Sequence, residues 1–374
     1  GFLSFLLTPP VKRLAHRIGA IDVPKDARRM HKKPIPRLGG LAIYISFVIV
    51  SLVLGQWNMQ NFTILIGSAI IVVLGIFDDR NALSAKFKFG IQLIAAAIPV
   101  VFGNLRIELI TNPNLFSGEL YVKFGALAIP ITIIWIVAIT NAVNLIDGLD
   151  GLAVGVSAIA CMTMLAVSLL IGEVPIAILL AVLAGACVGF MPFNLNPASI
   201  FMGDTGSTFL GFMLATLSIQ GMFKVYAIIS FAVPFLILGL PIFDTAFAFT
   251  RRILSGRSPF SPDRGHVHHR LIDMGFNQKQ TVAILYIIST VLGLLAVVLT
   301  TSGEYRAIVM VLVVLITCVV GGGIYLSAER RKMKLHEQKL HELNQQENEQ
   351  QKIAEQTQDA DDTSDRGGFD NEDN

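Results

Sequence analysis

The sequence predicts an all-α integral membrane protein, a polytopic bundle of about ten or eleven transmembrane helices. Hydrophobic residues make up 53% of the 374 residues and charged residues only 15%, and the mean hydropathy is +0.64. This balance is too apolar for a soluble domain. The apolar residues also gather in runs of about 17–24 residues, the length that an α-helix needs to cross a bilayer. The runs cover 39–55, 61–77, 87–102, 124–140, 152–171, 175–193, 207–222, 226–249, 280–301 and 306–327.

The two ends of the chain differ from its middle. The opening GFLSFLLT resembles the last part of one further helix, so we expect a first helix that is truncated at its N-terminus. From ERRKMK onward the chain is rich in Gln, Glu and Asp, and such a segment buries too little apolar area to fold. We therefore predict a transmembrane domain over 1–327 and a charged, disordered tail over 328–374, whose basic start contacts anionic lipid.

Basic residues predict the orientation in the membrane. Residues 9–38 are strongly basic, so the positive-inside rule places them in the cytoplasm. Alternating the spans from there places four polar loops and the tail on the cytoplasmic side. Loops without a common role should be scattered over both faces, so we expect one shared site in a cytoplasmic cleft. The four loops are 78–86, 141–151, 194–206 and 250–279.

Two adjacent carboxylates, Asp78 and Asp79, stand where one apolar run ends in FDDR. Ionisable groups at membrane depth are costly and usually mark function. Neighbouring side chains of a helix diverge, so we expect one aspartate to face the site and the other to face a structural partner. The alternative is a helix-end pair that is balanced by Arg80.

A second pair, Asp147 and Asp150, lies in NLIDGLDGLA directly after an uncharged run. Their spacing would place both on one face of a helix, but the glycine after each aspartate predicts a broken or tightly turned backbone. Such backbone is tolerated at membrane depth where it lines a wet cavity. Asn141 and Asn144 add amides suited to a base or a sugar. The alternative is that the two aspartates only cap helices.

Asp204 is flanked by glycines in FMGDTGS, just before the run at 207–222. Mg²⁺ prefers carboxylate oxygens, water and substrate phosphates to a complete protein cage, and a helix N-terminus favours anions. The motif is therefore a candidate Mg²⁺ site, with Mn²⁺ as the alternative ion. A role of Asp204 as the N-cap of the following helix is compatible with this.

The last inside loop contains RGHVHHRL, with two arginines and three histidines in eight residues. A zinc site would need Cys or carboxylate ligands at a matching spacing, which this motif lacks. A grip on a diphosphate also accounts for the arginines, and a merely basic inside loop is the third alternative. The residues are Arg264, His266, His268, His269 and Arg270.

Together, the carboxylates, a divalent metal, basic groups for phosphate and amides for a nucleoside indicate phosphoryl transfer from a soluble nucleotide to a membrane acceptor. A secondary transporter would place its carboxylates near the midplane on facing repeats, and the motifs do not repeat. A membrane scaffold or regulator is favoured only by the tail. Cys161, Cys187 and Cys318 lie in apolar runs without ligand spacing, and we expect them to be buried hydrophobes.

The motifs and their order along the chain resemble the polyprenyl-phosphate N-acetylhexosamine-1-phosphate transferases, glycosyltransferase family 4. The resemblance extends from residue 1 to about residue 327. The resemblance rests on DD at 78–79, NAVNLIDGLDGLA, NPASIFMGDTGS and the histidine motif. It implies a catalytic transmembrane domain in which a UDP-sugar and a lipid phosphate meet with Mg²⁺, giving lipid-diphosphate-sugar and UMP.

The resemblance further implies a multi-pass enzyme of the bacterial plasma membrane that begins the synthesis of a surface polymer such as teichoic acid. Its partners would be UDP-GlcNAc, undecaprenyl phosphate and membrane lipids, with no nucleic acid. A homodimer is left open. The active site and the tail would face the cytoplasm.

The resemblance also implies roles for single residues. Asp204 matches the principal Mg²⁺ ligand, and Asp147 matches a second one. Asp78 matches a carboxylate that deprotonates or orients the lipid phosphate, and Asp79 and Asp147 complete the catalytic set. The substrate-binding residues by resemblance are Asn144, Asp150 and Asn194 for the nucleoside, Arg264, His266, His268 and His269 for the diphosphate and aminosugar, and Lys33 and Arg37 for the phosphates.

Two departures from the pentapeptide branch of this family bear on the donor sugar. That branch typically reads DDxxK and has three consecutive histidines. Here Ala82 stands at the lysine position and the histidines read HVHH, as in the GlcNAc-1-phosphate branch. The resemblance therefore predicts UDP-GlcNAc as the donor, with phospho-MurNAc-pentapeptide transfer as the alternative.

Overall fold

A computed structural model describes residues 1–23, 34–111, 121–221, 232–254, 256, 265–301 and 338. The chain divides into two compact units, Gly1–Val314 and Leu315–Asn374, and every element below belongs to the first. The expected span at 306–327 lies outside the described residues, as do Lys33, Arg264 and Cys318 and the tail apart from residue 338.

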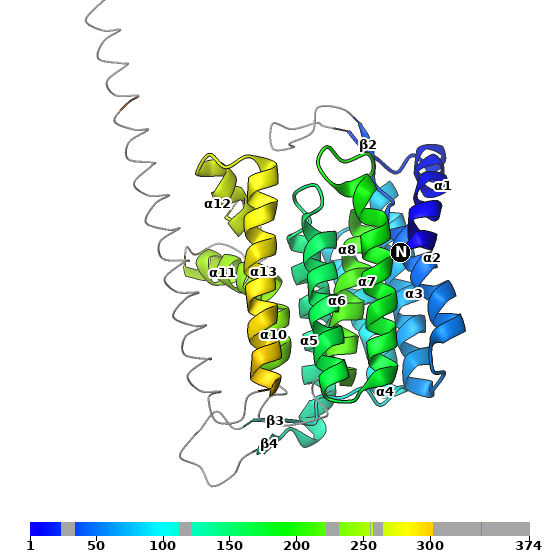
Figure 1. Cartoon of the computed structure of the whole chain (residues 1–374), viewed down its shortest axis with the longest axis vertical. Coiled ribbons are helices and arrows are strands. Elements are labelled where there is room, and N and C mark those ends of the chain that lie inside the picture. Colours follow the sequence, from blue (N-terminus) through cyan, green and yellow to red (C-terminus); the bar gives the residue numbers. More distant parts are fainter. Residues whose placement is uncertain are drawn as a thin grey trace, which may run out of the picture. The chain divides into compact units, whose positions relative to one another are not determined.

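The described part is a bundle of helices with two small antiparallel strand pairs (Figure 1). Strand β1 pairs with β2, and β3 pairs with β4. The helices are α1 (Phe2–Ile18), α2 (Gly40–Leu54), α3 (Met59–Arg80), α4 (Ala85–Val101), the 3₁₀ turn η1 (Gly125–Leu127), α5 (Ala128–Leu145), α6 (Leu152–Leu170), α7 (Val174–Asn194), α8 (Gly203–Gly221), α10 (Ala232–Ile237), α11 (Gly239–Leu254), α12 (Val267–Asp273) and α13 (Gln278–Thr301). The strands are β1 (Ile21–Asp22), β2 (Ile35–Pro36), β3 (Leu109–Thr111) and β4 (Tyr121–Lys123).

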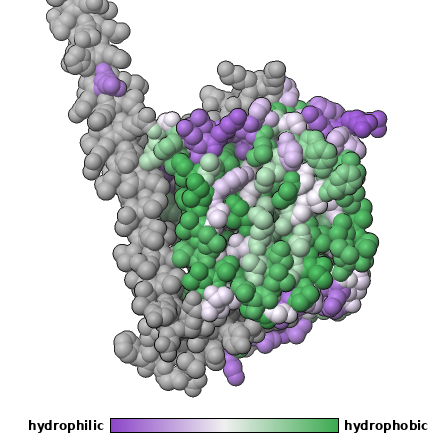
Figure 2. All heavy atoms as spheres, in the orientation of Figure 1, coloured by the Kyte–Doolittle hydropathy of each residue, from purple (hydrophilic) through white to green (hydrophobic). Residues whose placement is uncertain are grey.

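The surface of the described bundle is that of a membrane protein. Among the described residues, five helices are long and apolar enough to cross a membrane: α3, the segment Gly125–Ile146 that contains α5, α6, α7 and α13. Figure 2 shows a broad apolar belt with hydrophilic groups gathered toward its two ends. The predicted all-α, polytopic membrane fold is confirmed. The predicted count of ten or eleven spans stays a prediction, because some of these spans include residues outside the described part.

Polar side chains set the starts of two helices. The Asn58 side chain accepts a hydrogen bond from the Asn61 N–H at 2.8 Å, and it caps α3. The Ser84 hydroxyl accepts one from the Phe87 N–H at 3.4 Å, and it caps α4. Between these caps α3 runs past its predicted end at residue 77 and therefore includes both Asp78 and Asp79.

Helix α8 forms the centre of the bundle. All its residues except Asp204 are buried, and it packs against α2, α3, α5 and α6. A Cβ added to Gly75 of α3 would lie 2.4 Å from the Thr205 Cα, and one added to Gly40 of α2 would lie 2.0 Å from the Gly206 Cα. Glycine therefore allows α2 and α3 to approach the first turn of α8 with backbone against backbone.

One predicted span is wrong in its described part. The run at 226–249 was predicted as one continuous span, but the described chain breaks at Leu238 into two helices, α10 and α11. The second helix begins with GLP, and glycine and proline both disfavour the interior of a continuous helix. In Figure 1 α11 runs at a steep angle to α13 instead of along it.

Candidate active site

Asp79 joins the end of α3 to the start of α8. Its carboxylate accepts hydrogen bonds from the Asp204 N–H at 2.9 Å, from the Thr205 N–H at 3.0 Å and from the Thr205 hydroxyl at 2.6 Å. The first N–H groups of a helix have no partner within the helix and favour a negative charge. Asp79 therefore caps α8 from another helix, which is the structural partner expected for one member of the pair.

Asp204 lies in the first turn of α8 between two cations. Its Oδ1 is 3.5 Å from Nη2 of Arg37, and its Oδ2 is 3.1 Å from Nζ of Lys88. Because α8 already begins at Gly203, Asp204 is inside the helix and is not its N-cap. Each carboxylate oxygen has two lone pairs, so both can still accept a further ligand.

Arg37 connects the basic N-terminal segment to the GDTGS motif. Its Nε donates to Asp79 Oδ1 at 3.0 Å, and the neighbouring backbone pairs with that of Phe201, whose N–H donates to the Pro36 carbonyl at 2.8 Å. Burial opposes the charge of the guanidinium, but the carboxylates of Asp79 and Asp204 outweigh it and raise the pKa of Arg37. The side chain is therefore a fixed positive charge beside Asp204.

Lys88 of α4 was missed by the sequence analysis. Its Nζ lies 2.8 Å from Asp78 Oδ2 and 3.1 Å from Asp204 Oδ2, while Asp78 Oδ1 accepts from the Leu83 N–H at 2.7 Å. A lysine near the start of an apolar run was the available signal. Asp78 therefore pairs with an ammonium group from the next helix.

The loop between α5 and α6 has the tightly turned backbone that its glycines predict, and Gly151 has a φ of +80°. Asp147 in this loop lines the cavity. Burial, together with the charges of Asp204 and Asp79, raises the pKa of Asp147 to about 8, and Arg37 only partly opposes this. The negative charges of Asp204 and Asp79 beside Asp147 favour the binding of a cation near this carboxyl group.

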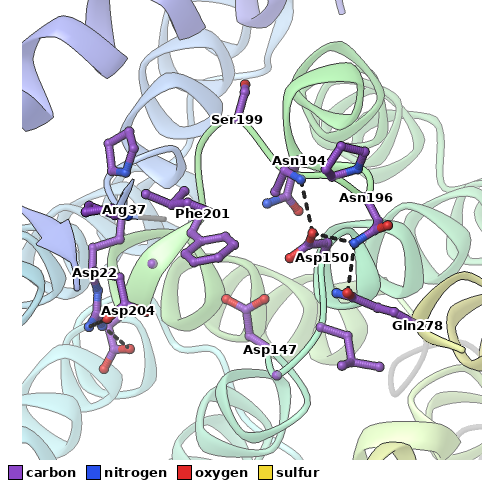
Figure 3. A pocket seen from close by; sticks show the side chains of 18 of the residues that line it. Asp22, Arg37, Asp147, Asp150, Asn194, Asn196, Ser199, Phe201, Asp204 and Gln278 are labelled. Atoms are coloured by element: carbon purple, nitrogen blue, oxygen red, sulfur yellow. Dashed lines mark hydrogen bonds and ion pairs between the residues drawn. The ribbon is translucent and has the colours of Figure 1, made fainter. Parts of the chain in front are cut away.

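Asp150 belongs to a second polar group, on the other side of the cavity. Its Oδ2 accepts from Asn196 Nδ2 at 2.9 Å and from the Ala198 N–H at 3.0 Å, and Asn196 Nδ2 also donates to Gln278 Oε1 at 2.8 Å. Figure 3 shows Arg37 and Asp204 on one side of the pocket, with Asp150, Asn196 and Gln278 on the other. No spacing in the sequence indicated Asn196 or Gln278.

Asn194 lines the cavity, but its amide is used within the protein. Its Oδ1 accepts from the Gly151 N–H at 3.2 Å, and its Nδ2 donates to the Ile200 carbonyl at 3.0 Å. The side chain is only 3% exposed. In this arrangement Asn194 fixes the loop that carries Asp150, and its predicted contact with the substrate stays a prediction.

The two other asparagines point to different partners. Asn144 lines the cavity and donates through Nδ2 to the Ser207 hydroxyl of α8 at 3.0 Å. Asn141 donates to Gln92 Oε1 of α4 at 2.7 Å, and it does not line this cavity. Only Asn144 therefore remains a candidate for contact with the substrate here.

The three histidines of the HVHH motif differ in their surroundings. His266 and His268 are buried, and His266 Nδ1 lies 2.8 Å from Oδ2 of Asp244 in α11. His268 packs against Gly148, and its burial and the imidazole of His269 lower its pKa to about 3. Of the three, His269 lines the cavity. Asp244 was not predicted as a site residue, although a carboxylate within an apolar run was a signal for it.

The cavity has a volume of about 960 Å³. Its walls come from α1, the segment around β2, the α5–α6 loop, the segment from Asn194 to Asp204, and the start of α13. Lys12, His16 and Asp22 also line it and were not singled out from the sequence. A cavity of this size suits a small-molecule substrate.

The carboxylates of the cavity suit a magnesium ion that the protein binds through only one or two ligands. Among the described residues, no group of three or more His, Cys, Asp or Glu side chains could hold a metal ion. Mg²⁺ is usually bound by one or two carboxylates together with water and substrate phosphates. Asp147 and Asp204, which both line the cavity, can provide such a pair.

The structure is a membrane helix bundle with a polar cavity, where two carboxylates lie near positively charged side chains. This arrangement is typical of membrane enzymes that transfer groups linked through phosphate. A family model described as glycosyl transferase family 4 matches residues 61–222. The chain is 43% identical over 312 residues to a probable undecaprenyl-phosphate N-acetylglucosaminyl 1-phosphate transferase of Bacillus subtilis (strain 168), covering 83% of this chain and 86% of that protein.

Two further relatives agree with this match. A decaprenyl-phosphate N-acetylglucosaminephosphotransferase of Mycobacterium tuberculosis is 35% identical, with 77% of each chain covered. An undecaprenyl-phosphate alpha-N-acetylglucosaminyl 1-phosphate transferase of Escherichia coli (strain K12) is 27% identical, covering 76% of this chain and 78% of that protein. The chain therefore belongs to glycosyl transferase family 4, and the resemblance drawn from its motifs is confirmed.

Proposed function

We propose that this protein transfers GlcNAc-1-phosphate from UDP-GlcNAc to undecaprenyl phosphate and releases UMP. The reaction takes place at the cytoplasmic face of a bacterial plasma membrane and begins the synthesis of a surface polymer. The names of the three relatives support the acceptor class and the amino sugar. The observation that carries the proposal is the position of Asp204, which lies between Arg37 and Lys88 beside a cavity that also contains Asp147.

The two sides of the cavity suit the two parts of the donor. Asp150, held by Asn196 and the Ala198 N–H, offers its other oxygen to a donor group such as the imide N–H of a uracil. Asp147 and Asp204 would hold Mg²⁺, which would neutralise the charge of the diphosphate when bound. The donor would thus lie with its base near α13 and its phosphates near α8.

The cations of the site suit the acceptor. Lys88 contacts both Asp78 and Asp204, so it can turn from a carboxylate to a phosphate oxygen without leaving the site. An oxygen of the lipid phosphate forms a bond to the phosphorus that carries the sugar. The bond from that phosphorus to the oxygen of UMP breaks, and UMP leaves with the electron pair. Asp78 is the candidate base for an acceptor that still carries its proton.

The proposal is tested with purified full-length protein, labelled UDP-GlcNAc, undecaprenyl phosphate and Mg²⁺. We expect label in the organic phase, a lipid product with the mass of undecaprenyl-diphosphate-GlcNAc, and one UMP for each lipid formed. Chelation of Mg²⁺ should stop the reaction, and added Mg²⁺ or Mn²⁺ should restore it. Label that stays free and intact would instead favour a transporter and would refute the proposal.

A further inference from the structure

Asp244 of α11 holds the start of α12 through both of its carboxylate oxygens. Its Oδ2 lies 2.8 Å from His266 Nδ1, and its Oδ1 accepts from the Val267 N–H at 2.7 Å. Asp244 is 4% exposed and His266 is 5% exposed. A carboxylate can only accept, so His266 donates from Nδ1, and the orientation of its ring is fixed.

Two further contacts join the same helices. Nη1 of Arg251 donates to the Gly265 carbonyl at 3.0 Å, just before α12 begins. The guanidinium of Arg270 lies 4.9 Å from the centre of the Phe247 ring. Such a contact between a cation and an aromatic ring is attractive. Because α12 has only seven residues, its position depends on contacts of this kind more than on its own stability.

The imidazoles continue from Asp244 toward the cavity. The rings of His266 and His268 are stacked at 5.9 Å, and the rings of His268 and His269 are 4.3 Å apart. A Cβ added to Gly148 would lie 2.4 Å from His268 Nε2, so His268 packs directly on the backbone of the loop that carries Asp147. His269, at the end of the row, lines the cavity.

We propose that Asp244 is a positioning residue of the active site. By fixing His266 and the start of α12, it places His269 on the cavity wall and His268 against Gly148. Asp244 does not line the cavity, so it acts through the histidines and not by touching the substrate. This inference rests on the proposed function, because its test measures the turnover of the donor UDP-GlcNAc.

The substitution Asp244→Asn tests this role with little change of shape. The amide keeps an acceptor oxygen for the Val267 N–H but presents a donor to His266 Nδ1. It can therefore no longer accept from an Nδ1–H, and it favours the other tautomer of His266. We expect kcat/KM for UDP-GlcNAc to fall about 10- to 100-fold, as when the carboxylate partner of a functional histidine is removed. Asp273→Asn is the matched control, because Asp273 is exposed at the end of α12, and it should keep wild-type turnover.

A double-mutant cycle separates positioning from general destabilisation. If Asp244 acts through α12, the loss in Asp244→Asn combined with His269→Ala should be smaller than the product of the two single losses. Asp244→Asn should also alter the same kinetic constant, kcat or KM, that His269→Ala alters. The proposal would be overturned if the loss of turnover in the double variant equalled the product of the two single losses. It would also be overturned if Asp244→Asn kept wild-type turnover.

His266→Asn keeps the test decisive if Asp244→Asn fails to fold. Asparagine carries an N–H donor at the same δ position as His266 Nδ1, so it can preserve the bond to Asp244. We expect His266→Asn to retain clearly more turnover than His266→Ala. Equal losses of turnover in the two variants would mean that the bond between His266 and Asp244 has no role, and this would overturn the inference. Failure of the wild-type protein to form the lipid product would instead refute the proposed function.

Discussion

Asp204 is an ionised carboxylate at the wall of the cavity, because the start of α8 and two cations stabilise its negative charge. It lies in the first turn of α8, it is held between Arg37 and Lys88, and it lines the cavity with Asp147. We predict that Asp204→Asn, which keeps the shape and removes the charge, lowers kcat/KM by about 100-fold or more, beyond the usual effect of residues that only support a ligand. Turnover measured over a Mg²⁺ titration checks this.

The control for this prediction is the exposed Asp273→Asn, which makes the same change of charge away from the site. Both variants should insert into membranes and elute from a sizing column in detergent as the wild type does. Near-normal activity of Asp204→Asn at limiting Mg²⁺ would contradict the proposal that Asp204 binds the metal ion.

Asp78 leads to a prediction about pH. The second pKa of a phosphate monoester is about 6, so a lipid phosphate needs a base mainly at low pH, where it still carries a proton. If Asp78 is that base, Asp78→Asn should lose most activity at pH 6 and recover part of it by pH 8–9. Each rate is taken relative to the wild type at the same pH and at saturating Mg²⁺.

Two other outcomes for Asp78→Asn have distinct meanings. A flat loss at every pH in a folded protein would contradict a base and would favour a covalent intermediate on Asp78. Near-normal rates at every pH would make Asp78 a structural partner of Lys88 and of the Leu83 N–H.

At the scale of helices, the site depends on how closely α3 approaches α8. A Cβ on Gly75 would lie 2.4 Å from the Thr205 Cα and 2.6 Å from the Thr205 N, which is one of the groups that Asp79 caps. We predict that Gly75→Ala destabilises the protein by about 1–3 kcal/mol, the usual cost of overpacking. It should also reduce turnover, because the capping contacts of Asp79 must shift.

The matched control is Gly90→Ala on α4, where an added Cβ meets nothing within 4 Å. Melting temperature in detergent and turnover should both fall for Gly75→Ala, and neither should fall for Gly90→Ala. Equal behaviour of the two variants would show that the approach of α3 to α8 does not support the site.

Helix boundaries illustrate what apolar patterns can and cannot predict. Run length gave the positions of most helices, because the bilayer sets one length for all of them. It failed at Leu238, where the apolar character continues through the break and only GLP marks it. It also ended the run at 61–77 one residue before the aspartates that belong to the last turn of α3.

At the scale of the whole molecule, the motifs predicted which loops matter but not which side chains meet. Asp147, Asp150 and Asp204 stood out because carboxylates among glycines are unusual beside apolar runs. Lys88 contacts Asp204 across 116 positions of sequence, and Asp79 binds the Thr205 N–H across 126. Such pairs depend on the packing of α3, α4 and α8, so no local pattern could identify them.

The predicted preference for the donor sugar also concerns the whole cavity. Its volume of about 960 Å³ suits a small-molecule substrate, with Arg37 and Asp204 on one side and Asp150, Asn196 and Gln278 on the other. Ala82 and the HVHH motif depart from the pattern of the pentapeptide branch. We predict that purified protein turns over UDP-GlcNAc and leaves UDP-MurNAc-pentapeptide unchanged. Competition between the two donors, followed by the mass of the lipid product, measures the ratio of their kcat/KM values. A ratio in favour of the pentapeptide donor would overturn this assignment of the sugar and leave the family intact.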